Sequence, residues 1–186
     1  MVLDAYNKVK SKKGSAGVDD QSLQNFGENL SGNLYKIWNR MTSGSYFPPV
    51  VKEVQIPKKA GRSRSLGIPT VSDRIAQQVI KSYLEPKVDR SFHTDSYGYR
   101  SEKSSHQALE KAVARSGCYS WVVDLDIRGF FDNIDHTLLM KAVKRYTKER
   151  WVLRYIERWL KAGVSRNGEI AKRTKGTPQG AVRDLG

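Results

Sequence analysis

The segment YSWVVDLDIRGFFDNIDH, residues 119–136, contains the strongest fold signal in the chain. Its first half is a run of bulky and β-branched residues that only Asp124 and Asp126 interrupt, a pattern typical of a buried strand. Side chains two positions apart on a strand point to the same face, so both carboxylates are expected on one side. The pattern therefore predicts a strand that carries two acidic groups inward and ends at the solvent-facing turn formed by Arg128 and Gly129.

The two aspartates predict a metal site, because an ionised carboxylate in an apolar setting has to be paired, protonated or bound to a metal. Magnesium takes one or two protein carboxylates and completes its octahedron with water and phosphate oxygens. Asp124 and Asp126 at the end of a strand suit that ion. The alternative is that one aspartate caps the turn while the other pairs with a nearby arginine.

Composition points to a polyanionic partner. The 186 residues contain 33 Lys and Arg against 19 Asp and Glu, a formal charge of +14, and the cations are spread over the whole length. Nucleic acid is the simplest partner of that kind, and a merely well-solvated basic surface is the alternative. Cys118, the single cysteine, excludes an intramolecular disulfide and a multi-cysteine zinc site. The length suffices for one or two small cores, and the sequence predicts a soluble intracellular (cytoplasmic) protein without a membrane span.

Hydrophobic periodicity predicts a mixed arrangement of helices and strands. Residues 1–20, which are rich in Lys, Gly and Ser toward their end, are expected to form an exposed loop. Two β-prone runs, at residues 50–56 and 64–68, predict a hairpin. Helical stripes occur at 23–41 with a break at 31–33, at 72–84 with Ser72 or Asp73 as cap and Pro86 beyond the end, at 101–117, at 136–146 and at 151–160.

Several polar residues are candidates for contacts with phosphate. Lys58 and Arg64 flank the tip of the predicted hairpin, where they either grip phosphate oxygens or remain solvated. Arg74 and Gln78 lie four residues apart, away from the apolar stripe of their helix, and are expected to face the same ligand. The turn Gly-Thr-Pro-Gln-Gly at 176–180 brings backbone amides and the Gln179 side chain toward something small.

The last two predicted helices have basic outer faces. Cations recur at helical spacing in both, so each helix is expected to present a stripe either to a phosphate backbone or to solvent. The first stripe contains Lys141, Lys144, Arg145 and Lys148, and the second contains Arg154, Arg158 and Lys161.

The order of motifs resembles the reverse transcriptases encoded by group II introns and their bacterial relatives. The matching strings are GVDDQSL (17–23), VQIPKKAGRSRSLGIPTVSDRIAQQVI (54–80), YGYRSEKSSHQALEKA (97–112), VVDLDIRGFFDNIDH (122–136) and KGTPQG (175–180). The resemblance covers nearly the whole chain and implies an α+β, right-hand polymerase fold. It implies fingers at 1–98, a first palm segment with the catalytic strand at 99–133, a helical return to the fingers at 134–171 and the start of a second palm segment at 172–186.

The resemblance also implies roles for individual residues. Asp126 looks like the first catalytic carboxylate, a ligand of Mg²⁺, with Asp124 and Arg74 as possible supports. Phe131 looks like the gate that lies under the nucleotide sugar and rejects a 2′-hydroxyl. The triphosphate and the nucleotide pocket would be contacted by Lys58, Arg64, Gln179 and Gly180, and RNA by Lys141, Lys144, Arg145 and Lys148. The implied partners are template or intron RNA, a DNA primer and deoxynucleoside triphosphates, with no membrane and no oligomeric state specified.

The sequence departs from the family pattern near its end. Relatives carry a second acidic motif, Tyr-Ala-Asp-Asp, which is absent here, and Arg183, Asp184 and Leu185 interrupt the apolar stretch that follows the GTPQG turn in relatives. The chain is therefore expected to be a fragment that is inactive by itself. Two further hypotheses are a non-catalytic RNA-binding module that aids splicing and a basic domain bound to another polyanion.

Overall fold

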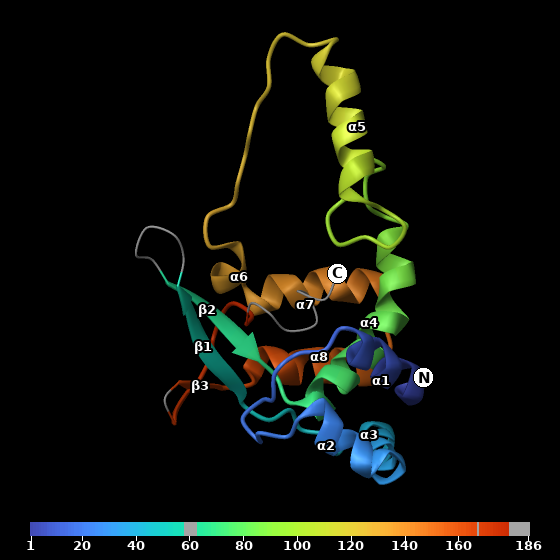
Figure 1. Ribbon diagram of the computed structural model, residues 1–186, viewed down its shortest axis with the longest axis vertical. Coiled ribbons are helices and arrows are strands. Elements are labelled where there is room, and N and C mark those ends of the chain that lie inside the picture. Colours follow the sequence, from blue (N-terminus) through green and yellow to red (C-terminus); the bar gives the residue numbers. More distant parts are fainter. Residues whose placement is uncertain (58–62, 167, 179–186) are drawn as a thin grey trace.

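The computed structural model describes residues 1–57, 63–166 and 168–178, which form a helical body and a four-stranded mixed sheet (Figure 1). The helices are α1 (Val2–Ser11), α2 (Leu23–Glu28), α3 (Leu30–Ser43), α4 (Val71–Asp89), α5 (Ser105–Ser116), α6 (Phe130–Asn133), α7 (His136–Tyr146) and α8 (Arg150–Lys161). The strands are β1 (Val51–Pro57), β2 (Ser63–Ile68), β3 (Val164–Arg166) and β4 (Glu169–Ala171). The predicted α+β class is confirmed.

The sheet has the strand order β2-β1-β3-β4. Strands β1 and β2 form the predicted hairpin, paired antiparallel from Lys52 opposite Ile68 to Pro57 opposite Ser63. The short strand β3 adds to β1 in parallel, and β4 pairs antiparallel with β3. No sequence signal predicts β3 and β4, because 164–171 is mostly polar and each strand has only three residues.

Helix α4 is the centre of the body and contacts α1, α3 and α7. It begins at Val71 and its cap is Thr70, whose hydroxyl accepts a hydrogen bond from the backbone amide of Asp73, so the prediction of Ser72 or Asp73 as the cap is wrong. It also runs past Pro86 to Asp89, so the prediction that Pro86 lies beyond the helix is wrong. A proline near a helix end removes a single backbone hydrogen bond, and the last turn tolerates that loss. The predicted stripe is buried, namely Ile75, Ala76, Val79 and Ile80, together with Val71.

The first part of the predicted amino-terminal loop is the helix α1. Ala5, Tyr6 and Val9 are buried against α4 and α3, and the Tyr6 ring stacks on Phe26 with 5.8 Å between ring centroids. Residues 12–20 then connect α1 to α2 without regular structure, as expected for the rest of that stretch. The break between α2 and α3 falls at Asn29, two residues before the predicted turn.

The predicted buried strand at 121–127 does not form. These residues have no regular secondary structure, and the exposed fractions of Trp121 and Leu125 are 89% and 88%. Figure 1 shows the segment returning as an extended chain from the far end of α5, which projects away from the body. A strand needs a neighbouring strand for its backbone hydrogen bonds, and no described residue pairs with this segment. Its apolar side chains therefore remain exposed.

The apolar face predicted for the helix at 101–117 is likewise uncovered, and that predicted for 136–146 is only partly covered. Helices α5 and α7 form close to the expected positions, but neither has a fully buried residue, and Leu109, Val113 and Leu138 are each more than 60% exposed. Among the described residues, no helix combines the length and the apolar character that crossing a membrane requires.

Candidate active site

The predicted gate residue and the predicted nucleotide-pocket turn lie together. Phe131 is in the short helix α6, and the turn at 175–178 docks on it through the Thr177 amide, which donates to the Phe131 carbonyl at 2.8 Å. The Gly176 amide donates to the Ile134 carbonyl, and a ring nitrogen of His136 is 2.8 Å from the Gly176 carbonyl oxygen. Two motifs that are far apart in the sequence therefore form one unit.

The tight docking depends on Gly176. Its φ is +74°, a backbone region that favours glycine, and an added Cβ would lie 2.6 Å from the Asp132 carbonyl oxygen and 2.8 Å from that of Phe131. Both neighbours are backbone atoms of α6, so a side chain at this position would separate the turn from the helix.

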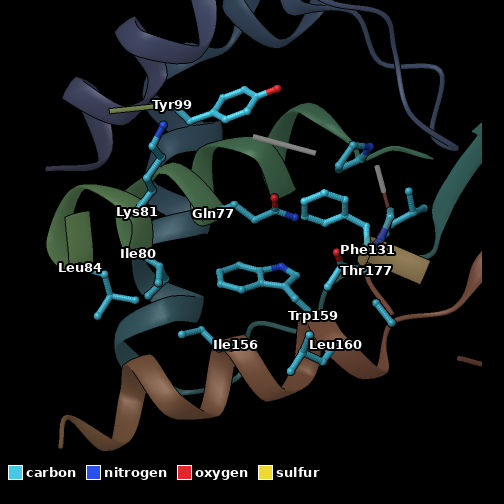
Figure 2. A pocket seen from close by; sticks show the side chains of 14 residues that line it. Gln77, Ile80, Lys81, Leu84, Tyr99, Phe131, Ile156, Trp159, Leu160 and Thr177 are labelled. Atoms are coloured by element: carbon cyan, nitrogen blue, oxygen red, sulfur yellow. The ribbon is translucent and has the colours of Figure 1, made fainter. Parts of the chain in front are cut away.

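A mostly apolar cavity of about 510 Å³ lies behind Phe131 (Figure 2). Thr177 and Pro178 contribute to its lining, and α4 and α8 contribute Gln77 and Trp159. In Figure 2 the amide end of Gln77 points toward the Phe131 ring, and the Trp159 indole lies beneath both. The packing of α4 against α8 therefore determines the space available behind the gate residue.

The buried carboxylate of Asp73 connects these two helices. It accepts hydrogen bonds from the Trp159 indole at 2.7 Å, from the Gln77 amide at 2.8 Å and from the Tyr46 phenol at 2.9 Å. Burial raises the pKa of Asp73 to about 6, and the three hydrogen bonds oppose that rise. Burial and the neighbouring Asp73 carboxylate also raise the pKa of the Tyr46 phenol, which keeps that group a donor.

Asp124 and Asp126 are exposed on the extended segment that precedes α6. Neither forms an ion pair with another described residue, so the structure differs from the alternative in which one of them pairs with an arginine. The described part of the chain contains no cluster of three His, Cys, Asp or Glu side chains suited to a metal. Two hard carboxylate oxygen donors that face solvent fit a magnesium ion only if water and substrate supply the other ligands.

The other predicted phosphate contacts lie mostly outside the described residues. Lys58, Gln179 and Gly180 are among the residues not described, and of Arg64 only the backbone is, paired with Ile56 across the hairpin. The expected roles of these four residues remain predictions.

Arg74 and Gln78, which were expected to face the same ligand, contact different parts of the chain. Both are buried on α4, where the Gln78 amide donates to the Ser82 hydroxyl. The Arg74 guanidinium donates to the carbonyls of Lys13 and Ser15, at 3.3 and 2.9 Å, and so anchors the connection between α1 and α2. Arg74 thus supports the fold, and no described contact of its side chain reaches the unit formed by Phe131 and the turn.

The two predicted basic stripes have different environments. The first stripe lies on or just after α7, and all four of its cations are exposed, namely Lys141, Lys144, Arg145 and Lys148. In the second stripe, Arg158 turns inward, donates to the Gly44 carbonyl at 2.8 Å and stacks on Phe47. Lys161 pairs with Glu157 at 2.6 Å, so α8 does not present a continuous cationic face.

Sequence reasoning missed Asp73, Gln77, Trp159 and His136 as site residues. The sequence predicts only a capping role for Asp73, with Ser72 as the alternative, because both residue types favour the start of a helix. Its partners Tyr46 and Trp159 are 27 and 86 residues away, and a single sequence contains no signal for such contacts. His136 closes the opening motif, but nothing in its spacing points to the turn 40 residues later.

Comparisons with known proteins identify the family and the relatives of this chain. Residues 56–183 match the family described as Reverse transcriptase (RNA-dependent DNA polymerase). The Group II intron-encoded protein LtrA of Lactococcus lactis subsp. cremoris is 34% identical over 96% of this chain and 30% of its own length. Protein YkfC of Escherichia coli K12 is 35% identical over 97% of the chain and 49% of its own length. The Putative COX1/OXI3 intron 1 protein of Saccharomyces cerevisiae is 30% identical over 98% of this chain and 22% of its own length.

A solved structure shares the fold. A chain of the Partial Cas6-RT-Cas1--Cas2 complex aligns with a TM-score of 0.62 and 24% identity over 99% of this chain and 31% of that one. The chain spans between 22% and 49% of the three curated relatives named above. Because the family match covers more than half of its residues, the chain belongs to the reverse transcriptase (RNA-dependent DNA polymerase) family and is related to group II intron-encoded proteins.

Proposed function

We propose that the chain supplies the fingers and the first part of the palm of a group II intron type reverse transcriptase, which copies RNA into DNA. The division is 1–98 for the fingers, 99–133 for the first palm segment, 134–171 for the helical return and 172–186 for the start of the second palm segment. The observation that carries the proposal is the docking of the turn at 175–178 on α6, which puts Thr177 and Phe131 in the lining of one pocket. A nucleotide pocket needs such a rigid wall to position the sugar.

In the proposed reaction, the primer 3′-hydroxyl attacks the α-phosphate of a deoxynucleoside triphosphate and pyrophosphate leaves. Magnesium, when bound, would supply the charge that activates the hydroxyl and stabilises the leaving group. Asp126 would hold the ion, with Asp124 beside it, and Lys58 and Arg64 would neutralise the triphosphate. Residues 1–186 alone are expected not to polymerise, because the described residues supply no further carboxylate cluster to complete the metal site.

Phe131 is expected to discriminate deoxyribonucleotides from ribonucleotides. In a full-length enzyme that carries residues 1–186, with the remaining domains taken from the group II intron-encoded protein LtrA, Phe131→Val should improve ribonucleotide use. Removing the ring leaves space for the 2′-hydroxyl, so the ratio of kcat/KM for dCTP over CTP should fall by about 10- to 100-fold. Single-nucleotide extension of a primed RNA template measures that ratio.

Phe131→Tyr is the matched control, because it keeps the ring that excludes the hydroxyl. It should retain most of the discrimination. Equal discrimination by the valine variant and the unchanged enzyme would remove Phe131 from the gate role and leave the family assignment intact.

A second function, RNA binding in support of splicing, is favoured by the cations on the outer face of α7. The 186-residue chain should bind structured RNA with a steep salt dependence and little sequence preference, because phosphate contacts release counterions. The triple variant Lys141→Ala/Lys144→Ala/Lys148→Ala should make the salt dependence less steep. The magnitude of the slope of log K, where K is the association constant for RNA, against log salt concentration should fall by about 2. Filter binding over a salt series measures the slope, and binding that does not change with salt would contradict a phosphate-based interface.

A further inference from the structure

A second cleft, of about 700 Å³, is built from three parts of the chain. Lys12 follows the end of α1, Lys81 and Glu85 come from α4, and the rest of the lining comes from residues 97–108. None of the contacts predicted from the sequence falls in this cleft. What it binds therefore has to be derived from its own chemistry.

The cleft carries more positive than negative charge. Lys12, Lys81 and Lys103 line it against the single carboxylate of Glu85, which is 3.8 Å from Lys81. Burial and the nearby charge of Lys81 lower the pKa of Lys12, and Lys12 forms no ion pair with another described residue. Lys12 and Lys81 both line the cleft, and two positive charges in one cleft favour a bound anion.

Arg100 also lines the cleft, but its guanidinium is engaged. It binds the Asp89 carboxylate through two nitrogens, at 2.7 and 3.0 Å, and so fixes the segment that follows α4. The lysines therefore supply the charge available to a ligand, and Arg100 holds one wall of the cleft in place.

Two tyrosines add flat surfaces to the basic cleft. The Lys103 ammonium lies 5.1 Å from the ring centroid of half-buried Tyr97. Tyr99 is 67% exposed and has a φ of +57°, a backbone region that bulky residues rarely adopt. Such strain is often found where a side chain is held for contact with a ligand.

The cleft adjoins the cavity behind Phe131, because Lys81 and Tyr99 line both. A chain-like ligand lying in the cleft would therefore be directed toward the gate residue. Phosphates between lysines and bases on aromatic rings are the two contacts by which proteins bind single-stranded nucleic acid. A duplex would not satisfy both contacts, because its bases are stacked on one another and cannot reach the tyrosines.

We propose that this cleft binds a single-stranded RNA segment, with a phosphate between Lys12 and Lys81 and a base against Tyr97 or Tyr99. The proposal rests on the reverse transcriptase function, for which it adds a binding site for the strand. A free nucleotide has the same phosphate and base, so the experiment has to separate a strand from a mononucleotide.

The first measurement is the affinity of the 186-residue chain for a fluorescent single-stranded oligoribonucleotide. Lys12→Ala/Lys81→Ala should weaken binding by about tenfold or more at low salt and lower the salt slope by about 1.4, since each phosphate contact on a single strand contributes about 0.7. The control Lys10→Ala/Lys36→Ala removes the same charge from exposed positions that do not line the cleft and should change binding much less. Equal loss in both double variants would overturn the proposal and reduce the effect to net charge.

The second measurement locates the strand by photocrosslinking. Gly98→Cys in a Cys118→Ser background gives a single thiol for a benzophenone label, and a Cβ at Gly98 has no atom within 4 Å. The label should crosslink to the oligoribonucleotide, unlabelled oligonucleotide should suppress the crosslink, and a nucleoside triphosphate at the same nucleotide concentration should not. Suppression by the triphosphate to the same extent would overturn the strand assignment in favour of a mononucleotide.

RNA binding without this crosslink would likewise overturn the proposal. The reverse transcriptase function would remain, because template-directed DNA synthesis by a full-length enzyme tests it separately. If instead RNA is crosslinked at position 98 but the full-length enzyme makes no DNA, the RNA-binding cleft would stand and the reverse transcriptase function would be wrong.

Discussion

Asp126→Asn in a full-length enzyme that carries residues 1–186 is expected to abolish DNA synthesis while leaving RNA affinity within about twofold of the unchanged enzyme. Asparagine preserves the shape of the side chain but removes the charge that holds a divalent cation, and a hard cation prefers carboxylate oxygens. The loss of kcat should be about 1,000-fold or more, because metal ions stabilise most of the charge that develops in phosphoryl transfer. Primer extension and filter binding on the same RNA template measure the two quantities.

Asp124→Asn is the matched control, two residues away on the same exposed segment. Because Asp124 is proposed to support the site, its substitution should lower kcat less than the change at Asp126. A reversal of the two severities would assign the metal to Asp124. Equal loss of RNA affinity and of kcat in the Asp126 variant would indicate a change in the fold of the segment.

Asp73→Ala is expected to destabilise the 186-residue chain by about 2–4 kcal/mol at pH 7. The change leaves the Tyr46 hydroxyl and the Trp159 indole without their acceptor, and each buried donor left unpaired costs about 1–3 kcal/mol. Relief from burying a charge offsets part of that loss. Urea denaturation followed by circular dichroism measures the change, since the midpoint moves with stability.

Asp73→Asn should behave differently and reveal the pH dependence. Burial raises the pKa of Asp73 in the folded state to about 6, above its ordinary value of 3.8. The contribution of this raised pKa to stability is therefore fully present below about pH 4 and is lost as the pH rises through about 6. Asparagine does not ionise, so the stability of the variant relative to the unchanged chain should increase by about 2 kcal/mol from pH 4 to pH 7.

The Asp73→Asn variant should fold normally at both pH values. The amide oxygen that it introduces can accept from Tyr46 and Trp159, and Gln77 can turn its own amide to accept from the new amide nitrogen. Other carboxylates titrate equally in the two chains and cancel in the difference. If the difference in unfolding free energy between the variant and the unchanged chain stays constant between pH 4 and pH 7, Asp73 does not have a raised pKa in the folded state.

The helical body is predictable because its signals are local. The stripe from Ile75 to Ile80 recurs at helical spacing and is buried as expected, and the β-prone runs on either side of 58–62 form the hairpin. Helix α1 was missed although Ala5, Tyr6 and Val9 have a helical period, because the lysines among them and the glycine-rich stretch that follows indicate an exposed loop.

The prediction of a strand at 121–127 failed for a different reason. Its sequence pattern specifies which faces of a strand would be apolar, but a strand forms only when neighbouring strands complete its hydrogen bonds. The described residues provide no such neighbour, so Trp121 and Leu125 are exposed. The site likewise combines local signals with tertiary contacts. The motifs indicate Phe131 and the GTPQG turn separately. The contact between them through Thr177, and the hydrogen bonds that Asp73 accepts, depend on tertiary packing.

The most direct test of the reverse transcriptase assignment is the addition of one nucleotide to a DNA primer annealed to RNA by a full-length enzyme carrying residues 1–186. Four templates that differ only in the first unpaired base should each direct the complementary deoxynucleotide, in the presence of magnesium, with no product from the Asp126→Asn enzyme. The intact relative that supplied the remaining domains serves as the positive control. Addition that ignores the template base, or undiminished addition by the Asp126→Asn enzyme, would contradict the assignment.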